Sequence, residues 1–307
     1  MQSSWQHAAD GFFQRLDVST NSVRTYREAL KTFYRWWEER RCPPLTKETM
    51  RDYRDWLKSC RAINTVMTYS VALKRFFKDA HSHGFIDHNP MDDLKQLRRP
   101  QGHLRRDLTR TELRAVFDQI DRSTLLGKRD FAMVNLMARN GLRIIEVHRS
   151  NYGDLEQRLG RTILRVMGKG RDERDEFVVL SEATVEALMA YLDARGNLQS
   201  TSPLFSQSST PQGPAPVSKK KSRKGELRIS VRHIRRRVTE YFKGAGVKTP
   251  KTTVHSLRHS FVTLAIQGGA SIMEAQAAAR HRSIQTTMIY FHEHGRLDNP
   301  IEDRIKI

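Results

Sequence analysis

The sequence predicts two domains: an all-helical domain over residues 1–95 and a mixed, mostly helical domain with a small antiparallel sheet over residues 108–307. Apolar residues recur at helical spacing through the first third of the chain. A basic stretch at 96–107, QLRRPQGHLRRD, then contains proline and glycine but no apolar periodicity, which predicts a linker. Beyond it, two β-rich runs flank a Gly-Lys-Gly turn. With 307 residues, the chain is long enough for each domain to bury its own core.

Three apolar stripes predict helices in the first domain, at residues 26–37, 50–60 and 66–77. Pro43 and Pro44 are expected to stop the first of these helices. Aromatic residues and arginines interleave along the stripes, a pattern that also occurs on surfaces where nucleic-acid bases stack. At helical spacing the aromatic residues are better explained as core, with the basic side chains facing solvent or phosphate.

The second domain begins with a helix signal. Thr109 and Glu112 have the spacing of a capping box ahead of an apolar helical stripe. A second helix is expected to stop at Asn140-Gly141, because these residue types favour the left-handed backbone conformation that ends helices.

A β-hairpin is predicted from the runs at 162–167 and 176–180, with Lys169 at or near its tip. Helix resumes at 182–194. Residues 199–226 are rich in serine, proline and glycine and end in a basic run, which predicts a long loop without a core of its own. The lysines of this loop either contact phosphates or are simply solvated.

The charge of the chain favours a polyanionic partner. Lysine and arginine number 54 against 34 aspartates and glutamates, a net charge of +20. Residues 1–107 carry +7 and residues 108–307 carry +13, so both domains are basic. The two cysteines have no metal-site spacing, and the first ten residues lack the features of a signal peptide. The most apolar stretch, 261–273, is too short to cross a bilayer. We therefore expect a cytoplasmic protein that does not enter a membrane.

Six scattered residues suit phosphoryl transfer to a tyrosine hydroxyl. A planar guanidinium donates paired hydrogen bonds to phosphate oxygens, and two such groups can clamp one phosphate. No cage of carboxylates for Mg²⁺ is evident, and the histidines lack zinc-site spacing, so no metal or other cofactor is expected. The candidate catalytic residues are Arg143, Lys169, His255, Arg258, His281 and Tyr290.

The contexts of these residues resemble the motifs of the tyrosine recombinase (phage integrase) family, which includes the Xer-like and Cre-like site-specific recombinases. The family pattern Gly-Leu-Arg-x-x-Glu occurs at 141–146, and His-x-Leu-Arg-His occurs at 255–259. His281 and Tyr290 stand nine positions apart, the interval usual in the family. The resemblance covers nearly the whole chain.

The resemblance implies a core-binding, SAM-like domain at 1–95 and a catalytic domain with the DNA breaking-rejoining enzyme fold at 108–307. It implies that Tyr290 attacks a DNA phosphate, leaving a 3′-phosphotyrosyl link, and that Lys169 protonates the departing 5′ oxygen. Assistance in deprotonating Tyr290 is left open between His281, His255 and the phosphate itself. It also implies double-stranded DNA with inverted repeats as partner, and a homo-tetramer in the synaptic complex.

Three further expectations concern residues beside the six. Glu146 is expected to brace the turn of Arg143, and His259 to pack or cap rather than to catalyse. The residue before His281 is commonly glycine in the family, whereas this chain has Arg280. This departure leaves open how tightly the helix start at His281 is packed, and it allows Arg280 to add a phosphate contact. The alternatives to a recombinase are a type IB topoisomerase that relaxes supercoils, and a catalytically silent DNA-binding regulator with the same fold.

Overall fold

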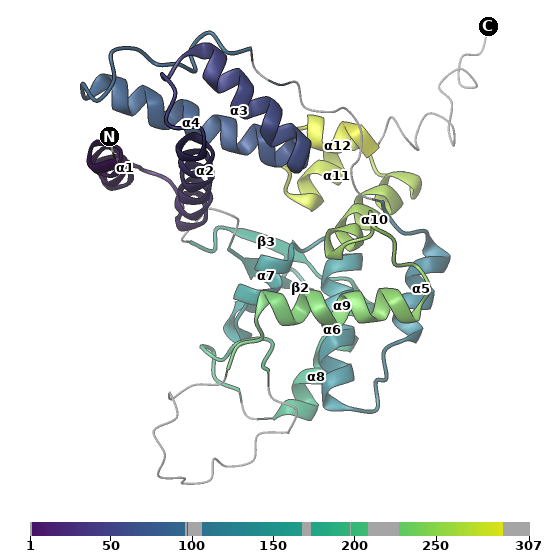
Figure 1. Ribbon diagram of the computed structural model, residues 1–307. Coiled ribbons are helices and arrows are strands. Elements are labelled where there is room, and N and C mark those ends of the chain that lie inside the picture. The colour runs from purple at the N-terminus through teal and green to yellow at the C-terminus, as the bar shows by residue number, and fades with distance from the viewer. Residues whose placement is uncertain are drawn as a thin grey trace, which may run out of the picture. The chain divides into compact units, whose positions relative to one another are not determined.

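The computed structural model divides the chain into two compact units, Met1–Gln101 and Gly102–Ile307, each built mainly of helices (Figure 1). The division falls within the stretch predicted as a linker. The structure describes residues 2–95, 97, 106–167, 173–196, 198–207 and 227–290.

The N-terminal unit is all-helical, as predicted, and its aromatic residues form the core. Phe33 is fully buried and meets the rings of Tyr53 and Phe77 edge-on, with centroids 5.0 and 5.6 Å apart. Edge-to-face packing of this kind is favourable beyond the area that it buries. The helices are α1 (Gln2–Arg15), α2 (Thr20–Glu39), α3 (Lys47–Cys60) and α4 (Ile63–Ser82).

The end of α2 differs in detail from the expectation. The helix stops at Glu39, ahead of the two prolines, and Arg41 and Cys42 both have a positive φ, of 59° and 52°. The helix therefore ends at this left-handed turn, before the prolines can stop it. Cys42, which precedes Pro43, would in any case be disfavoured in the α-helical region. Cys60, the last residue of the stripe predicted at 50–60, is also the last residue of α3 and is exposed.

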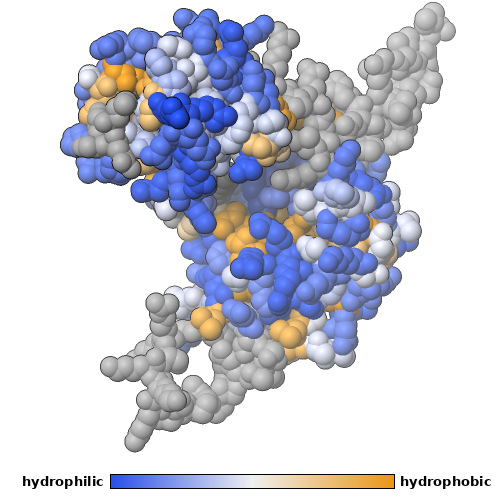
Figure 2. All heavy atoms as spheres, viewed as in Figure 1, coloured by the Kyte–Doolittle hydropathy of each residue, from blue (hydrophilic) through white to orange (hydrophobic). Residues whose placement is uncertain are grey.

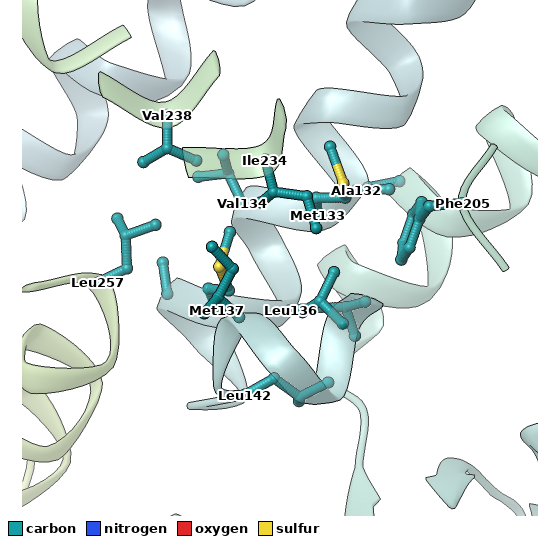
Figure 3. Close-up of a cluster of buried hydrophobic side chains, with 14 of the residues drawn as sticks. Ala132, Met133, Val134, Leu136, Met137, Leu142, Phe205, Ile234, Val238 and Leu257 are labelled. Atoms are coloured by element: carbon teal, nitrogen blue, oxygen red, sulfur yellow. The ribbon is translucent and has the colours of Figure 1, made fainter. Parts of the chain in front are cut away.

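The core of the C-terminal unit is built around α6, whose side chains are buried on every side over most of its length. Figure 3 shows its residues Met133, Leu136 and Met137 among apolar side chains from other elements, including Val238 and Leu257. The helices of this unit are α5 (Arg110–Asp118), α6 (Leu125–Arg139), α7 (Ile144–Arg149), η1 (Tyr152–Asp154), α8 (Glu182–Arg195), α9 (Val231–Gly244), α10 (Val254–Gln267), α11 (Ile272–Ala279) and α12 (Gln285–Tyr290).

The predicted hairpin is confirmed, and a third strand extends it. Strands β2 (Arg161–Val166) and β3 (Glu176–Val179) pair antiparallel, with Leu164 opposite Val178. Strand β1 (Leu155–Arg158), which the prediction lacked, pairs with β2 through a tight turn at Leu159-Gly160, where both residues have positive φ. Its sequence, LEQR, is mostly polar and gives little β signal. The tip between β2 and β3, including Lys169, lies outside the described residues.

Both helix-boundary predictions for this unit are confirmed. Thr109 and Glu112 make the two reciprocal bonds of a capping box at the start of α5. Gly141 follows α6 with a φ of +65°, and a Cβ atom built on it would lie 2.5 Å from the ring of Phe261. Both the backbone conformation and the close approach of Phe261 therefore require glycine at this position.

Hydrophilic residues dominate the visible face of each unit (Figure 2). Within the described part of the chain, none of the helices has the length and apolar character needed to cross a membrane.

Gly141→Ala should destabilise the protein more than Gly246→Ala. Gly246 also has a positive φ, of +70°, but no atoms lie where its Cβ would project. Its replacement should cost the backbone penalty alone, about 1–2 kcal/mol. Gly141→Ala should cost about 1–3 kcal/mol more, because of overpacking against Phe261. The free energy of unfolding in denaturant measures both, and equal costs would contradict the packing argument.

Candidate active site

Four of the six predicted residues meet in the C-terminal unit. Arg143 lies between α6 and α7, Arg258 on α10, His281 between α11 and α12, and Tyr290 at the end of α12. The fifth, His255, is half-buried on the first turn of α10, three residues before Arg258.

Arg143 is held by Glu146, as predicted. It is the residue that precedes α7, and its backbone N–H donates to Glu146 Oε2 at 2.7 Å while its Nη1 donates to Oε1 at 2.6 Å. The glutamate is buried, with 1% of its surface exposed. The three-residue spacing of the Arg-x-x-Glu motif is that of a helix-capping pair, so one carboxylate orients both the turn and the guanidinium.

Arg258 is buried at the centre of the site. Its Nη1 donates to the carbonyl of Gly141 and its Nη2 to the carbonyl of Ala279, so it joins the end of α6 to the end of α11. Burial lowers the pKa of Arg258, and the neighbouring charges of Arg143 and Arg280 lower it further. The site therefore concentrates positive charge in a place with little solvent to screen it.

His281 is a neutral imidazole in this environment. Its Nδ1 shares a hydrogen bond of 2.9 Å with the hydroxyl of the buried Thr287. Burial lowers the pKa of His281 to about 4, with further contributions from Arg258, Arg143 and Arg280. Above that pH, the ring can accept as well as donate a proton.

Tyr290 packs in a small apolar cluster with Val262, Ala275 and Ala279, and only 4% of its surface is exposed. Its ring lies nearly parallel to that of His281, at a centroid distance of 6.5 Å and an angle of 14°. Its hydroxyl is hydrogen-bonded to Nδ1 of His259. This contact was missed from the sequence; the signal for it was that His259 lies four residues after His255, on the same face of α10.

Tyr241, another buried tyrosine of the C-terminal unit, has a structural role. Its hydroxyl donates to Oδ2 of Asp130 at 2.7 Å and accepts from Arg237 at 2.6 Å. Burial raises the pKa of Tyr241, and the adjacent carboxylate of Asp130 raises it further. A hydroxyl so hard to ionise is poorly suited to act as a nucleophile.

Arg280 belongs to the cluster, although it was not among the six residues. It has a left-handed backbone, with φ 54° and ψ 49°, which accounts for the glycine that the family commonly has there. Its Nη2 donates to Glu146 Oε2 at 2.6 Å, and its carbonyl accepts from Arg143 Nη2 at 3.0 Å. His281 follows in the turn before α12 rather than at a helix start.

The assembled cluster is suited to bind an anion. Arg143 and Arg280 donate to the buried carboxylate of Glu146, and the guanidinium of Arg258 is near enough to interact with the charges of all three. A groove of about 630 Å³ lies against Arg280, and His281 and residues of β3 also line it. Among the described residues, no group of three or more histidine, cysteine, aspartate or glutamate side chains is arranged to hold a metal ion.

Comparison with known proteins identifies the family. Residues 106–296 match the model of the phage integrase family, and residues 8–96 match the phage integrase SAM-like domain. This chain belongs to the phage integrase family. The tyrosine recombinase XerC of Myxococcus xanthus is 32% identical over 275 residues, covering 89% of this chain and 87% of the relative. XerD of Vibrio cholerae is 26% identical over 287 residues, covering 92% and 88%.

Solved structures of tyrosine recombinases share the predicted fold, a SAM-like domain followed by a catalytic integrase domain. XerH bound to its palindromic difH substrate, in a post-cleavage complex, has a TM-score of 0.70 at 20% identity, covering 91% of this chain and 79% of XerH. A lambda integrase dimer bound to a COC′ core site has a TM-score of 0.67 at 14% identity, covering 93% and 96%.

The His281 ring should titrate at about pH 4 in the DNA-free protein, well below the ordinary histidine value of 6.5. Because the folded pKa is the lower one, the contribution of His281 to stability is lost as the pH falls from 6.5 toward 4. NMR of ring-labelled histidine gives the value directly, with His281→Asn identifying the signal. Arg143→Ala should raise the pKa, because one of the charges that lowers it is gone. A value at or above 6.5 in the parent would refute the proposed environment.

Proposed function

We propose that this protein is a site-specific DNA recombinase that cleaves and rejoins strands through a 3′-phosphotyrosyl link at Tyr290. The observation that carries the proposal is the convergence of Arg143, Arg258 and His281 around the Tyr290 ring, in a family whose relatives are named tyrosine recombinases.

Arg143 and Arg258 are the proposed phosphate ligands. A guanidinium has five N–H donors. The bonds described for Arg143 and Arg258 engage two N–H groups on each side chain, which leaves donors for the two non-bridging oxygens. Fixed donors stabilise the charge that builds up on these oxygens as the phosphorus becomes five-coordinate. His255, one turn before Arg258 on α10, is the proposed further contact.

Tyr290 is the proposed nucleophile. Its oxygen forms a bond to phosphorus while the bond from phosphorus to the 5′ oxygen breaks, and the leaving oxygen takes a proton from Lys169. A tyrosine hydroxyl has an ordinary pKa of about 10, so its proton must be removed as attack proceeds. The hydrogen bond to His259 adds that residue to His281, His255 and the phosphate as possible acceptors.

The proposed partner is double-stranded DNA with inverted repeats, and the proposed assembly is a homo-tetramer in the synaptic complex. The net charge of +20, shared between both domains, supports the first. Relatives of this fold solved as a dimer on a core site and as a tetramer on a Holliday junction support the second. We propose the cytoplasm as the compartment in which the protein meets its DNA.

Tyr290→Phe should abolish covalent attachment to DNA while leaving DNA affinity nearly unchanged, because only the nucleophilic oxygen is lost. The measurement is a denaturing gel of the protein with a radiolabelled suicide substrate, alongside a binding titration at fixed salt. Tyr241→Phe is the matched control and should still form the adduct. An adduct in Tyr290→Phe would move the nucleophile elsewhere.

The same preparation separates the two active alternatives. A recombinase should yield recombinant product from two sites, whereas a type IB topoisomerase should relax plasmid without recombining it. A silent regulator should bind DNA and do neither.

Lys169→Ala should cripple cleavage of ordinary DNA but leave cleavage of DNA with a 5′-bridging sulfur close to the parent rate. A thiolate is a good leaving group even without protonation. A sulfur at the 5′-bridging position should therefore compensate for the loss of a general acid that acts on that atom. Single-turnover cleavage rates on the two substrates give the comparison. His255→Ala serves as control and should not be rescued as fully. Failure of sulfur to rescue Lys169→Ala would make the lysine a phosphate contact or a bystander.

A further inference from the structure

The side chain at position 280 occupies a place where the backbone alone would favour glycine. The left-handed conformation of Arg280 costs about 1–2 kcal/mol for a residue with a Cβ atom. Glycine would make the same turn without that cost, and its carbonyl could still accept from Arg143. The backbone bond from Arg143 Nη2 to the Arg280 carbonyl therefore does not require an arginine. What an arginine adds is its guanidinium.

That guanidinium is turned inward onto Glu146. Only 7% of the Arg280 side chain is exposed, while the Glu146 side chain is fully buried. Nη2 of Arg280 and the backbone N–H of Arg143 donate to the same oxygen, Oε2 of Glu146, and Nη1 of Arg143 donates to the other. On its far side, Arg280 Nε lies 3.6 Å from the carboxylate of Glu176 on β3. One carboxylate thus receives both guanidiniums, from segments 137 residues apart.

We propose that Arg280 is a positioning residue for DNA cleavage: it keeps the buried Glu146 carboxylate ionised, and through it holds Arg143 in place for the scissile phosphate. The proposal rests on the function proposed above for Arg143. It does not require Arg280 to touch DNA.

The charges around Glu146 determine whether its pKa lies above or below the usual value. Arg143 donates to its carboxylate from the turn before α7, and Arg280 donates to it from the end of α11. The charge of Glu146 also acts on Arg258 of α10, and the carboxylate of Glu176 on β3 lies 3.6 Å from Arg280. Burial by itself raises the pKa of Glu146, but Arg280 and then the bonds from Arg143 outweigh it and hold the pKa below its usual value.

Removing Arg280 should reverse that balance. With its strongest opposing charge gone, burial should raise the pKa of Glu146 above the usual 4.5. A protonated Glu146 pairs poorly with Arg143, so the guanidinium would lose its anchor as the pH falls. The pKa of His281 should rise as well, because Arg280 is one of the charges that lowers it. The experiment must therefore separate the Glu146 effect from the His281 effect.

The test is a double-mutant cycle between positions 280 and 146, measured first on the DNA-free protein. The four proteins are the parent, Arg280→Gly, Glu146→Gln and the double variant, each unfolded in denaturant at several pH values from 4 to 8. Replacing Arg280 by glycine changes the pKa of His281 and relieves backbone strain whether position 146 is glutamate or glutamine. Both contributions therefore cancel in the cycle. We expect a coupling of about tenfold or more in the folding equilibrium constant at pH 7, as for one buried charged hydrogen bond, falling as the pH approaches 4. Additive effects at every pH would overturn the proposal.

The second readout is the pH profile of single-turnover adduct formation. Arg280→Gly should be slower than the parent by about tenfold at pH 7, and its acid limb should lie at higher pH than that of the parent. Arg280→Lys, which keeps a cation, should bring the limb back toward the parent position. Arg282→Gly removes the same charge from an exposed residue two positions away and should leave the limb unmoved.

The outcomes separate this proposal from the proposed function. No adduct in the parent would sink the recombinase function, while the unfolding cycle would still report on Arg280 and Glu146. An adduct in the parent with an unshifted limb in Arg280→Gly would sink the positioning role alone. A rate loss for Arg280→Gly of equal size in the Glu146→Gln background would instead make Arg280 a direct phosphate contact.

Discussion

The site depends on one buried carboxylate. Glu146 is shielded from solvent, and a charge in that position is tolerated only when it is paired and fully hydrogen-bonded. It is paired twice, by Arg143 from the adjoining turn and by Arg280 from the end of α11. Arg258 makes a parallel connection, from α10 to the carbonyls of Gly141 and Ala279. These bonds hold together the turns that carry the catalytic candidates.

The same arrangement leaves an excess of positive charge in a site with little water. Burial lowers the pKa values of Arg258 and His281, and the positive charges of the neighbouring arginines lower both further. A phosphate diester bound among the guanidiniums would relieve this repulsion, which gives the site an electrostatic preference for an anionic ligand. An imidazole that is neutral before DNA arrives can then exchange a proton during the reaction.

Much of the fold and many of the candidate site residues could be predicted, because they follow from patterns over short stretches of sequence. Apolar spacing located α2, α3 and α4 of the N-terminal unit but not α1, the capping box located the start of α5, and Asn140-Gly141 located the end of α6. Strand β1 was not predicted because its four residues are mostly polar. Its strand conformation depends on pairing with β2. Cys60 was misplaced because a stripe cannot show that its last member lies at a helix end, open to solvent.

The sequence by itself determined the two-domain organisation, the basic character, the family and the identity of the candidate catalytic side chains, since each follows from composition or from motifs within a few residues. Only the tertiary structure decided which partners those side chains have. Tyr290 meets His259 across 31 positions and Arg280 meets Glu146 across 134. Contacts over such separations depend on how α7, α10, α11 and α12 pack together. No local pattern encodes that packing, so the role of Arg280 emerges only from the folded chain.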